Sequence, residues 1–418
     1  MEKLKVIVAH PGKQHSFQLA TGLNRDGMLF KYITTVYDKK NSILMKATRF
    51  FLSDNDKKRA FGRRCEGLRD EQVVQFCQLR SMVTLLLVRL DKSRKIYNAW
   101  NQLVANSFSR KVANYAIRNK VDAVIMYDSS AEKCFEILEK RAPQIKRILD
   151  ASCANRAFVK QIYEEDMQRS PLWAKTLKSE KEFLWKYPLD GYVHEGQLAT
   201  GILAASNFVK RSYTVYGVDA NRIHIVPYGV DVSNFQPIAP TKHEEIRFIF
   251  VGGVRQMKGI SYLLEAFTKL HAEFPMTQLE IVGDCHISDN LLKPYKDIVL
   301  FSGYLLHNEV AERLHQADVF VFPSLADGFG LAGIEAMGSG LPMIVSDNSG
   351  ISDIITDECS FVVRTGDCTA LYEKMRFFCQ NPEYIQKMGA VARKVAKSCT
   401  WENYYQNIQI AVKDICNQ

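Results

Sequence analysis

Two acidic residues in the C-terminal half of the chain are spaced so that they could hold a polyhydroxylated ligand. Asp327 follows a short apolar run that ends at Pro323, and Glu335 comes eight residues later on a segment that favours a helix from about Gly330. Carboxylates placed in this way can accept hydrogen bonds from different parts of one ligand. The intervening glycines allow close approach of backbone N–H groups, and the helix dipole favours an anionic or hydroxyl-rich group. By spacing alone, most such acid pairs are structural.

The N-terminal half offers histidines and an aspartate in loops that follow apolar runs. His10 and His15 lie in the loop after the first run, on either side of Gly12, and Asp150 comes at the end of a later run. A histidine in such a loop could bind an acceptor or a phosphate, although a lone loop histidine is more often incidental. Asp150 could orient or deprotonate a hydroxyl group, and a helix-capping aspartate is an equal alternative.

These residues need elements that bring them together, and the chain has a regular pattern of short apolar runs separated by helix-length stretches. The pattern predicts an α/β fold with two doubly wound parallel sheets, in which ligands bind beyond the carboxyl ends of the strands. The runs are 5–9, 32–36, 123–127, 147–149, 201–205 and 223–226 in the first half and 247–251, 279–282, 298–301, 319–322, 343–345 and 361–363 in the second.

The join between the two sheets is expected at Asp231–Glu245, a stretch that is rich in turn-forming residues and contains Pro237 and Pro240. The sequence therefore predicts an N-terminal domain of residues 1–240, a C-terminal domain of residues 241–399, and a cleft between them.

Composition places the chain among soluble globular proteins. Apolar residues make up 47%, and no run approaches the ~18 apolar residues that a membrane-spanning helix needs. Met1 is followed almost directly by the first strand-like run, so no signal peptide is expected and a cytoplasmic location is predicted. The ten cysteines are scattered singly without a CxxC pair, which predicts thiols rather than disulfides or a zinc site.

Charge differs between the two halves. Residues 1–240 have a net charge of +15 and residues 241–418 a net charge of −6. A positive half suggests an anionic partner such as a membrane surface or a lipid-linked phosphate, and no nucleic-acid-binding motif accompanies the charge. Much of the excess lies in Asp38–Lys120, a stretch expected to be mostly helical that could rest on a membrane or frame an acceptor. Ordinary surface helices with solvated charges are an equal alternative.

The pattern from Pro323 to Pro342 resembles the retaining family 4 glycosyltransferases of GT-B fold. Their C-terminal domain has an acid-x7-acid motif, usually Glu at both ends, followed by Ala-Met and Gly-x-Pro; Asp327 to Glu335 matches this spacing with Asp in place of the first Glu. The resemblance covers nearly the whole chain and weakens across residues 38–120. It implies two facing Rossmann-like domains with a central cleft, and a last helix, residues 400–418, that crosses back to the first domain.

The resemblance implies a nucleoside-diphosphate sugar as donor. Asp327 would contact the donor sugar, Glu335 the ribose hydroxyls, and Lys258 the pyrophosphate, where a cation stabilises the charge gained by the leaving diphosphate. No metal or other cofactor is implied, because no Asp-x-Asp motif stands in the matching loops. The remaining implied donor residues are Gly12, Gly253, Arg255, Tyr304, Phe329, Gly330 and Leu331.

Two of these donor assignments have alternatives. Arg255 would replace the arginine that many relatives have directly after the loop glycine, and a solvated loop charge is as good an interpretation. Tyr304 would lie beside the nucleobase, or else be a buried packing residue.

The implied acceptor is a hydroxyl group, expected on a saccharide or lipid-linked saccharide at an anionic membrane surface during assembly of a cell-surface glycan. Asp150 would take the place of a cleft histidine found in many relatives, and His10 and His15 are candidate acceptor ligands. The competing functions are a nucleotide-sugar epimerase or glycan phosphorylase of the same fold, and a non-catalytic nucleotide-sugar-binding protein. A Rossmann dehydrogenase is disfavoured, since no GxGxxG follows the first strand.

Overall fold

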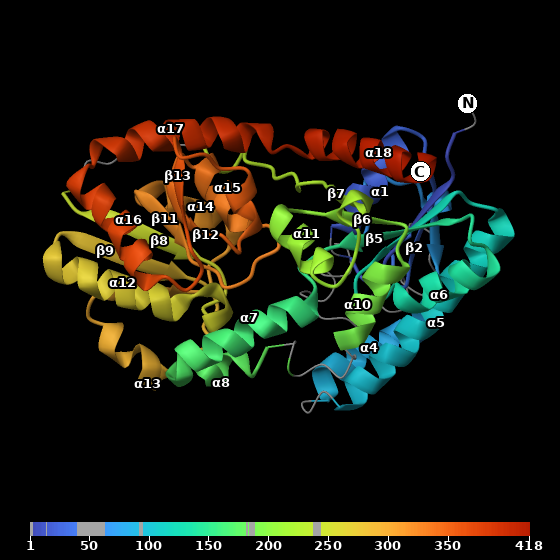
Figure 1. The fold of residues 1–418 in the computed structure, drawn as a ribbon, viewed down its shortest axis with the longest axis horizontal. Coiled ribbons are helices and arrows are strands. Elements are labelled where there is room, and N and C mark those ends of the chain that lie inside the picture. Colours follow the sequence, from blue (N-terminus) through green and yellow to red (C-terminus); the bar gives the residue numbers. More distant parts are fainter. Residues whose placement is uncertain are drawn as a thin grey trace.

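A computed structural model describes residues 3–13, 15–39, 63–91, 95–180, 183, 189–236 and 244–418, without the side chains of residues 85, 86, 88 and 89. It contains two parallel sheets that lie side by side along the long axis of the molecule, with helices around each (Figure 1). The predicted α/β fold with two doubly wound sheets is therefore confirmed.

The first sheet has seven parallel strands: β1 (Val6–Ala9), β2 (Leu29–Thr34), β3 (Val73–Gln75), β4 (Ala123–Tyr127), β5 (Lys146–Ala151), β6 (Gly201–Ala204) and β7 (Ile223–Ile225). Their order is β3-β2-β1-β4-β5-β6-β7. Every residue of β1 and β4 is buried, which explains why both strands read as unbroken apolar runs. All six predicted strands are present. The edge strand β3 was not predicted, because it has only two apolar residues, Val73 and Val74, which lie between Gln72 and Gln75.

The second sheet has six parallel strands: β8 (Ile246–Val251), β9 (Thr277–Val282), β10 (Val299–Gly303), β11 (Val319–Phe322), β12 (Met343–Ser346) and β13 (Ser360–Val363). Their order is β10-β9-β8-β11-β12-β13, and all six were predicted. The order changes direction between β8 and β11, so the loops after these two strands flank a crevice of the kind in which open parallel sheets bind ligands.

Helices connect the strands of both sheets. In the N-terminal half they are α1 (Ser16–Arg25), α4 (Gln78–Leu90), α5 (Lys95–Asn119), α6 (Glu132–Arg141), α7 (Arg156–Arg169), α8 (Ala174–Leu177), α10 (Leu189–Leu198) and α11 (Asn207–Thr214). In the C-terminal half they are α12 (Ile260–Glu273), α13 (Asp289–Leu292), α14 (His307–Gln316), α15 (Leu331–Gly338), α16 (Cys368–Gln380), α17 (Glu383–Ser398) and α18 (Trp401–Asn417).

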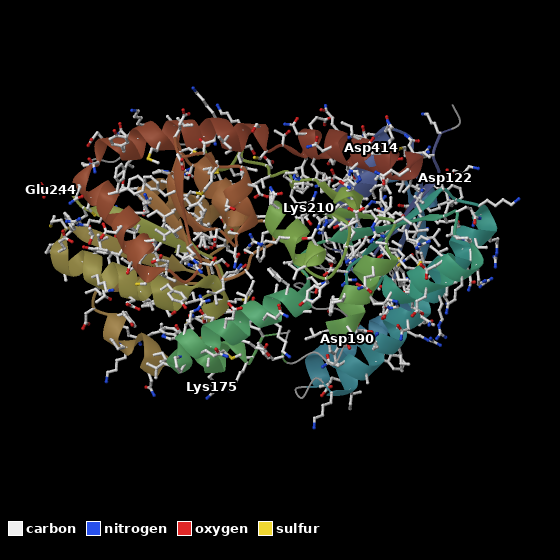
Figure 2. All side chains as sticks on the ribbon, in the orientation of Figure 1. Asp122, Lys175, Asp190, Lys210, Glu244 and Asp414 are labelled. Carbon is white, nitrogen blue, oxygen red and sulfur yellow. The ribbon has the colours of Figure 1, made fainter. Side chains whose placement is uncertain are left out.

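The last helix, α18, returns to the first sheet and packs against α1. The Gln409 side chain donates to the Gly22 carbonyl at 2.8 Å, and a Cβ at Gly22 would lie only 2.9 Å from the Tyr405 ring. Figure 2 shows Asp414 of α18 over the N-terminal half, while Glu244, just before β8, lies at the opposite end of the molecule.

One helix of the N-terminal half, α7, extends to the C-terminal half. Near the end of α7, Asp166 accepts hydrogen bonds from Gln256 Nε2 at 2.9 Å and from Tyr262 Oη at 2.6 Å, and Figure 1 shows α7 and α8 beneath the second sheet. Burial raises the pKa of the Asp166 carboxyl, and the two hydrogen bonds oppose that rise. Residues around 160–180 are thus attached to the C-terminal half. The domain limits 1–240 and 241–399 remain a prediction, and residues 237–243 lie outside the described part of the chain.

The basic stretch Asp38–Lys120 is partly helical, as predicted, through α4 and α5, and it also contains β3. Residues 40–62, among them Lys57, Lys58 and Arg59, lie outside the described residues. All ten cysteines are described and none is in a disulfide, which confirms that they are thiols. Among the helices described, none combines the length and apolarity that crossing a membrane requires.

Candidate functional site

The loop between β11 and α15 carries the predicted acid pair, and its backbone is fixed by the neighbouring loop after β12. The Asp327 N–H donates to the Asn348 carbonyl at 2.9 Å, and the Asp327 carbonyl accepts from the Gly350 N–H at 2.9 Å. The Phe329 N–H donates to Asp327 Oδ1 at 3.1 Å, which orients the carboxylate. Gly330 caps α15 with a φ of 86°, a conformation that favours glycine, and the predicted helix start is confirmed.

Lys258 and Asp327 meet across two loops. The Lys258 ammonium forms an ion pair with Asp327 Oδ2 and lies 5.2 Å from the centre of the Phe322 ring. Both side chains are largely but not fully buried, with 18% and 16% of their surface exposed. Gly259 has a φ of 70°, and a Cβ there would lie 1.9 Å from the Pro323 carbonyl oxygen, so only glycine lets the two loops approach this closely. The structure thus brings together the cation and the acid predicted to face the donor.

Glu335 lies on α15 with no hydrogen-bond partner for its carboxylate among the described residues. Burial raises the pKa of the Glu335 carboxyl, and His307 nearby opposes the rise. A half-buried carboxylate without partners is costly, which is typical of a group kept for a ligand.

The other predicted donor residues differ in their accessibility. Phe329 is buried, whereas Leu331 is 47% exposed and Tyr304 is 74% exposed. A buried packing role for Tyr304 is therefore wrong. A Cβ at Gly253 would meet the side chain of Arg255, at 3.7 Å from its Nε.

Arg255 is held by an acid from the N-terminal half. Its Nη1 lies 3.3 Å from both carboxylate oxygens of Glu180, whose side chain is only 8% exposed. The interpretation of Arg255 as a solvated loop charge is therefore wrong, because the guanidinium pairs with a buried carboxylate across the two halves.

On the N-terminal side, His15 and Asp150 form a pair with 3.1 Å between His15 Nε2 and Asp150 Oδ1. The His15 side chain is 15% exposed and that of Asp150 4%. Asp150 belongs to β5 and does not cap α7, since the Asn155 side chain does so by accepting from the Ala157 N–H. The capping alternative for Asp150 is wrong.

His10 is buried, and its Nδ1 accepts a hydrogen bond from the Gly12 N–H at 2.8 Å. Burial lowers the pKa of the His10 imidazole to about 4, so the ring is neutral at neutral pH. A neutral ring cannot attract phosphate by charge, and a role for His10 in binding acceptor remains a prediction.

Aromatic contacts join the two sides of the site. The Tyr228 ring centre lies 4.3 Å from that of His15 and 5.3 Å from that of Phe329. Ser206 Oγ, at the start of α11, donates to the Gly328 carbonyl at 2.7 Å. Neither Tyr228 nor Ser206 is predicted as a site residue from the sequence, because each contacts a partner more than 100 residues away. The only local signal at Ser206 is its position as the N-cap of α11.

Two further features could receive small ligands. A cavity of about 190 Å³ lies between α7 and the loops that follow β11, β12 and β13, lined in part by Arg169, Leu325, Asn348 and Arg364. Among the described residues, Glu132, Glu136 and His194 lie close enough together to hold a metal ion. Two of these residues already pair with each other, His194 Nδ1 and Glu132 Oε1 at 3.0 Å, and Glu136 pairs with Lys133.

Known proteins resemble the chain in two ways. Residues 231–395 match the family described as glycosyl transferases group 1. The MMP alpha-(1->4)-mannosyltransferase of Mycolicibacterium hassiacum is 31% identical over 192 residues, which is 44% of this chain and 46% of that protein. The sulfoquinovosyl transferase of Arabidopsis thaliana is 28% identical over 197 residues, 44% of this chain and 38% of that protein. The matches thus span less than half the length of both relatives.

Similarity of fold extends over the full chain. Sucrose-phosphate synthase from Thermosynechococcus elongatus superposes with a TM-score of 0.62 over 99% of both chains at 17% identity. Such low identity shows the fold and not the activity. Residues 231–395 thus match the group 1 glycosyl transferases, and the chain as a whole has the GT-B fold.

Proposed function

We propose that the chain is a retaining hexosyltransferase that moves a sugar from a nucleoside-diphosphate sugar to a hydroxyl acceptor. The observation that carries the proposal is the Lys258–Asp327 ion pair at the carboxyl ends of β8 and β11. A bound diphosphate would compete for Lys258 and release Asp327 to accept hydrogen bonds from the sugar. Glu335, about one turn after the start of α15, would receive the ribose hydroxyls.

Retention is proposed to follow from attack on the face that the leaving group departs from. The bond between the anomeric carbon and the diphosphate oxygen breaks, and the acceptor oxygen bonds to the same face. The acceptor proton passes to the departing diphosphate, whose new charge Lys258 stabilises. No side chain needs to form a covalent intermediate.

His15 and Asp150 are proposed to serve the acceptor. Of the two, His15 is the more exposed, so its ring is placed to hydrogen-bond the acceptor hydroxyl, and the buried Asp150 carboxylate fixes the orientation of that ring. Asp150 is then a positioning residue, in the way that a buried carboxylate commonly orients a histidine.

The acceptor is proposed to be a saccharide or lipid-linked saccharide in cell-surface glycan assembly, reached by a cytoplasmic protein that binds peripherally to the inner face of the membrane. The +15 charge of residues 1–240 supports this choice, since each Lys or Arg near anionic lipid contributes about 1 kcal/mol. A soluble phosphorylated acceptor would need only a local cationic patch.

Thermal unfolding with UDP-, GDP- and ADP-sugars tests the proposal, because a ligand that binds the folded state raises its unfolding midpoint. The stabilising donor is then incubated with candidate acceptors, and the anomeric configuration of the product is read by NMR. Release of nucleoside diphosphate only when acceptor is present separates a transferase from an epimerase. Binding of donors without turnover on any acceptor would leave a nucleotide-sugar-binding protein, and an inverted product would exclude retention.

A further inference from the structure

Helices α4 and α5 form a hairpin that projects from the N-terminal half. The Trp100 indole donates to the Arg80 carbonyl at 3.0 Å, and Arg80 Nη1 donates to Ser107 Oγ at 3.2 Å, so the two helices pack antiparallel. The buried residues of α5 begin at Val104, and none precedes it. The first turns of α5, together with α4, therefore lie outside the part of the hairpin that packs on the sheet.

The projecting part exposes aliphatic side chains. Eight of the thirteen residues of α4 are apolar, yet of those whose side chains are described none is buried. The exposed fractions are 68% for Leu79, 40% for Val83, 68% for Leu90, 64% for Ile96 and 62% for Leu103. Spacings of four and seven residues put the three α4 residues on one helix face, and a spacing of seven does the same for the two on α5. We call these five residues the hairpin stripe.

The part of the chain that carries the hairpin stripe is strongly basic in sequence. From Gln78 to Lys120 the chain has nine Lys or Arg residues and a single acid, Asp91. Lys95 and Arg110, on α5, are both exposed. Exposed apolar side chains on a strongly basic helical hairpin combine the two features that bind helices to the surface of an anionic bilayer.

We propose that the hairpin stripe docks on an anionic lipid bilayer, with its aliphatic side chains at the acyl boundary and its cations against the headgroups. A second copy of the chain fits less well, because a symmetric contact would bring the same positive charges face to face. Nucleic acid would bind the cations but leave five aliphatic side chains without a partner.

The location suits the proposed acceptor, and in this respect the inference rests on the proposed function. The hairpin starts where β3 ends, at the carboxyl edge of the first sheet, and the loops that hold His15 and Asp150 follow β1 and β5 at the same edge. A bilayer that touches the hairpin would therefore present a lipid-linked hydroxyl on the acceptor side of the cleft.

Sedimentation with vesicles tests the docking. The full chain is mixed with vesicles of equal parts phosphatidylcholine and phosphatidylglycerol, or of phosphatidylcholine alone. The variant Leu79→Ser/Val83→Ser/Leu90→Ser removes the α4 part of the hairpin stripe, and Lys95→Gln/Arg110→Gln removes two charges. Val215→Ser/Ile410→Ser is the matched control, since these residues, just after α11 and on α18, are exposed by 57% and 59%.

The full chain should bind the anionic vesicles, and added salt should weaken that binding. The partition coefficient should fall about tenfold or more in each hairpin variant, since every charge near anionic lipid contributes about fivefold, and should stay unchanged in the control. Unfolding midpoints close to that of the parent chain would show that the variants fold.

Several outcomes would overturn the docking. The first two are a lack of binding to anionic vesicles at low salt, and binding by the stripe variant that equals binding by the parent chain. The third is a dimer that the stripe variant converts to a monomer. The fourth is a stripe variant whose only change is a lower unfolding midpoint, as expected if the chain itself covered the hairpin stripe. Stabilisation by nucleotide sugars is measured in parallel. Its absence would refute the proposed transferase while leaving a positive vesicle result intact.

Discussion

The proposed donor side, around Lys258 and Asp327, and the proposed acceptor side, around His15 and Asp150, are built differently. On the donor side, the acids and glycines of the loop after β11 are neighbours in sequence, and the Phe329 N–H contacts Asp327 two residues away. On the acceptor side, His15 and Asp150 are 135 residues apart and meet only through the order of the strands. A contiguous motif can be read from one sequence, whereas a pair assembled by the sheet requires the fold.

The two sides are also held by different forces. Glycines fix the donor loops: a Cβ at Gly259 would meet the Pro323 carbonyl at 1.9 Å, and one at Gly283 would meet the Gly252 carbonyl at 1.8 Å. Tilted and edge-to-face contacts between aromatic rings around Tyr228 hold the acceptor side. Side chains can repack more easily than the backbone can move, so the donor side should tolerate fewer substitutions than the acceptor side.

The largest effect is expected on the donor side. Lys258→Ala should lower kcat by about 10²–10³, the usual cost of losing one preorganised group that stabilises developing charge. Steady-state rates at saturating donor measure this, with Lys269→Ala on the exposed face of α12 as control. If Lys258→Ala kept a rate close to that of the parent chain, Lys258 would have no role in the mechanism. The expectation that the donor side is the more sensitive side would then also be wrong.

A smaller effect is expected from the acceptor pair. His15→Gln and Asp150→Asn should each lower kcat by roughly 10–10²-fold, at or below the lower range for groups that transfer a proton. If Asp150 acts by orienting His15, the double variant should be little worse than either single variant. The double-mutant cycle and the pH profile of kcat/KM measure this coupling. Fully additive losses would show that the two residues act separately.

The sequence predicts the donor side better than the acceptor side for physical reasons. Most of the described strands contain a short apolar run, so twelve of them could be recognised, whereas β3, with Val73 and Val74 as its apolar residues, could not. The Asp327–Glu335 spacing needs only local geometry. The crossing of α7 through Asp166 and the Arg255–Glu180 pair each depend on partners at least 75 residues away, which no local pattern specifies.

The two sides should also differ in how their stability depends on pH, and Glu335 tests this on the donor side. The raised pKa of Glu335 means that the folded state favours the neutral carboxyl. The contribution of this carboxyl to the free energy of unfolding is therefore fully present below about pH 4.5 and is lost as pH rises through the pKa of the folded state. Glu335→Gln should therefore raise the unfolding midpoint at pH 7 and lose that advantage near pH 4. Donor KM should increase by about five- to tenfold with little change in kcat, as expected for uniform binding.

Exposed Glu358 supplies the control for that experiment, because Glu358→Gln should change neither the unfolding midpoint nor donor KM. A lower unfolding midpoint for Glu335→Gln at pH 7 would mean that the carboxylate is stabilising. A loss of kcat by orders of magnitude at constant donor KM would give Glu335 a role other than holding ribose.

The smallest effect on activity, and the opposite dependence on pH, is expected from His10 on the acceptor side. Its pKa is lowered from 6.5 to about 4, so the folded state favours the neutral ring. The stability that the neutral ring contributes is complete above pH 6.5 and is lost as pH falls towards 4, a change of about 3 kcal/mol if the unfolded chain titrates normally.

His10→Asn keeps an acceptor for the Gly12 N–H but does not titrate, so its unfolding midpoint should fall less steeply between pH 6.5 and 4. Denaturation across this range measures the slope, with His286→Asn, a ring that is 40% exposed, as control. Equal slopes for the parent chain and His10→Asn would show that His10 does not carry the acid sensitivity of the acceptor side.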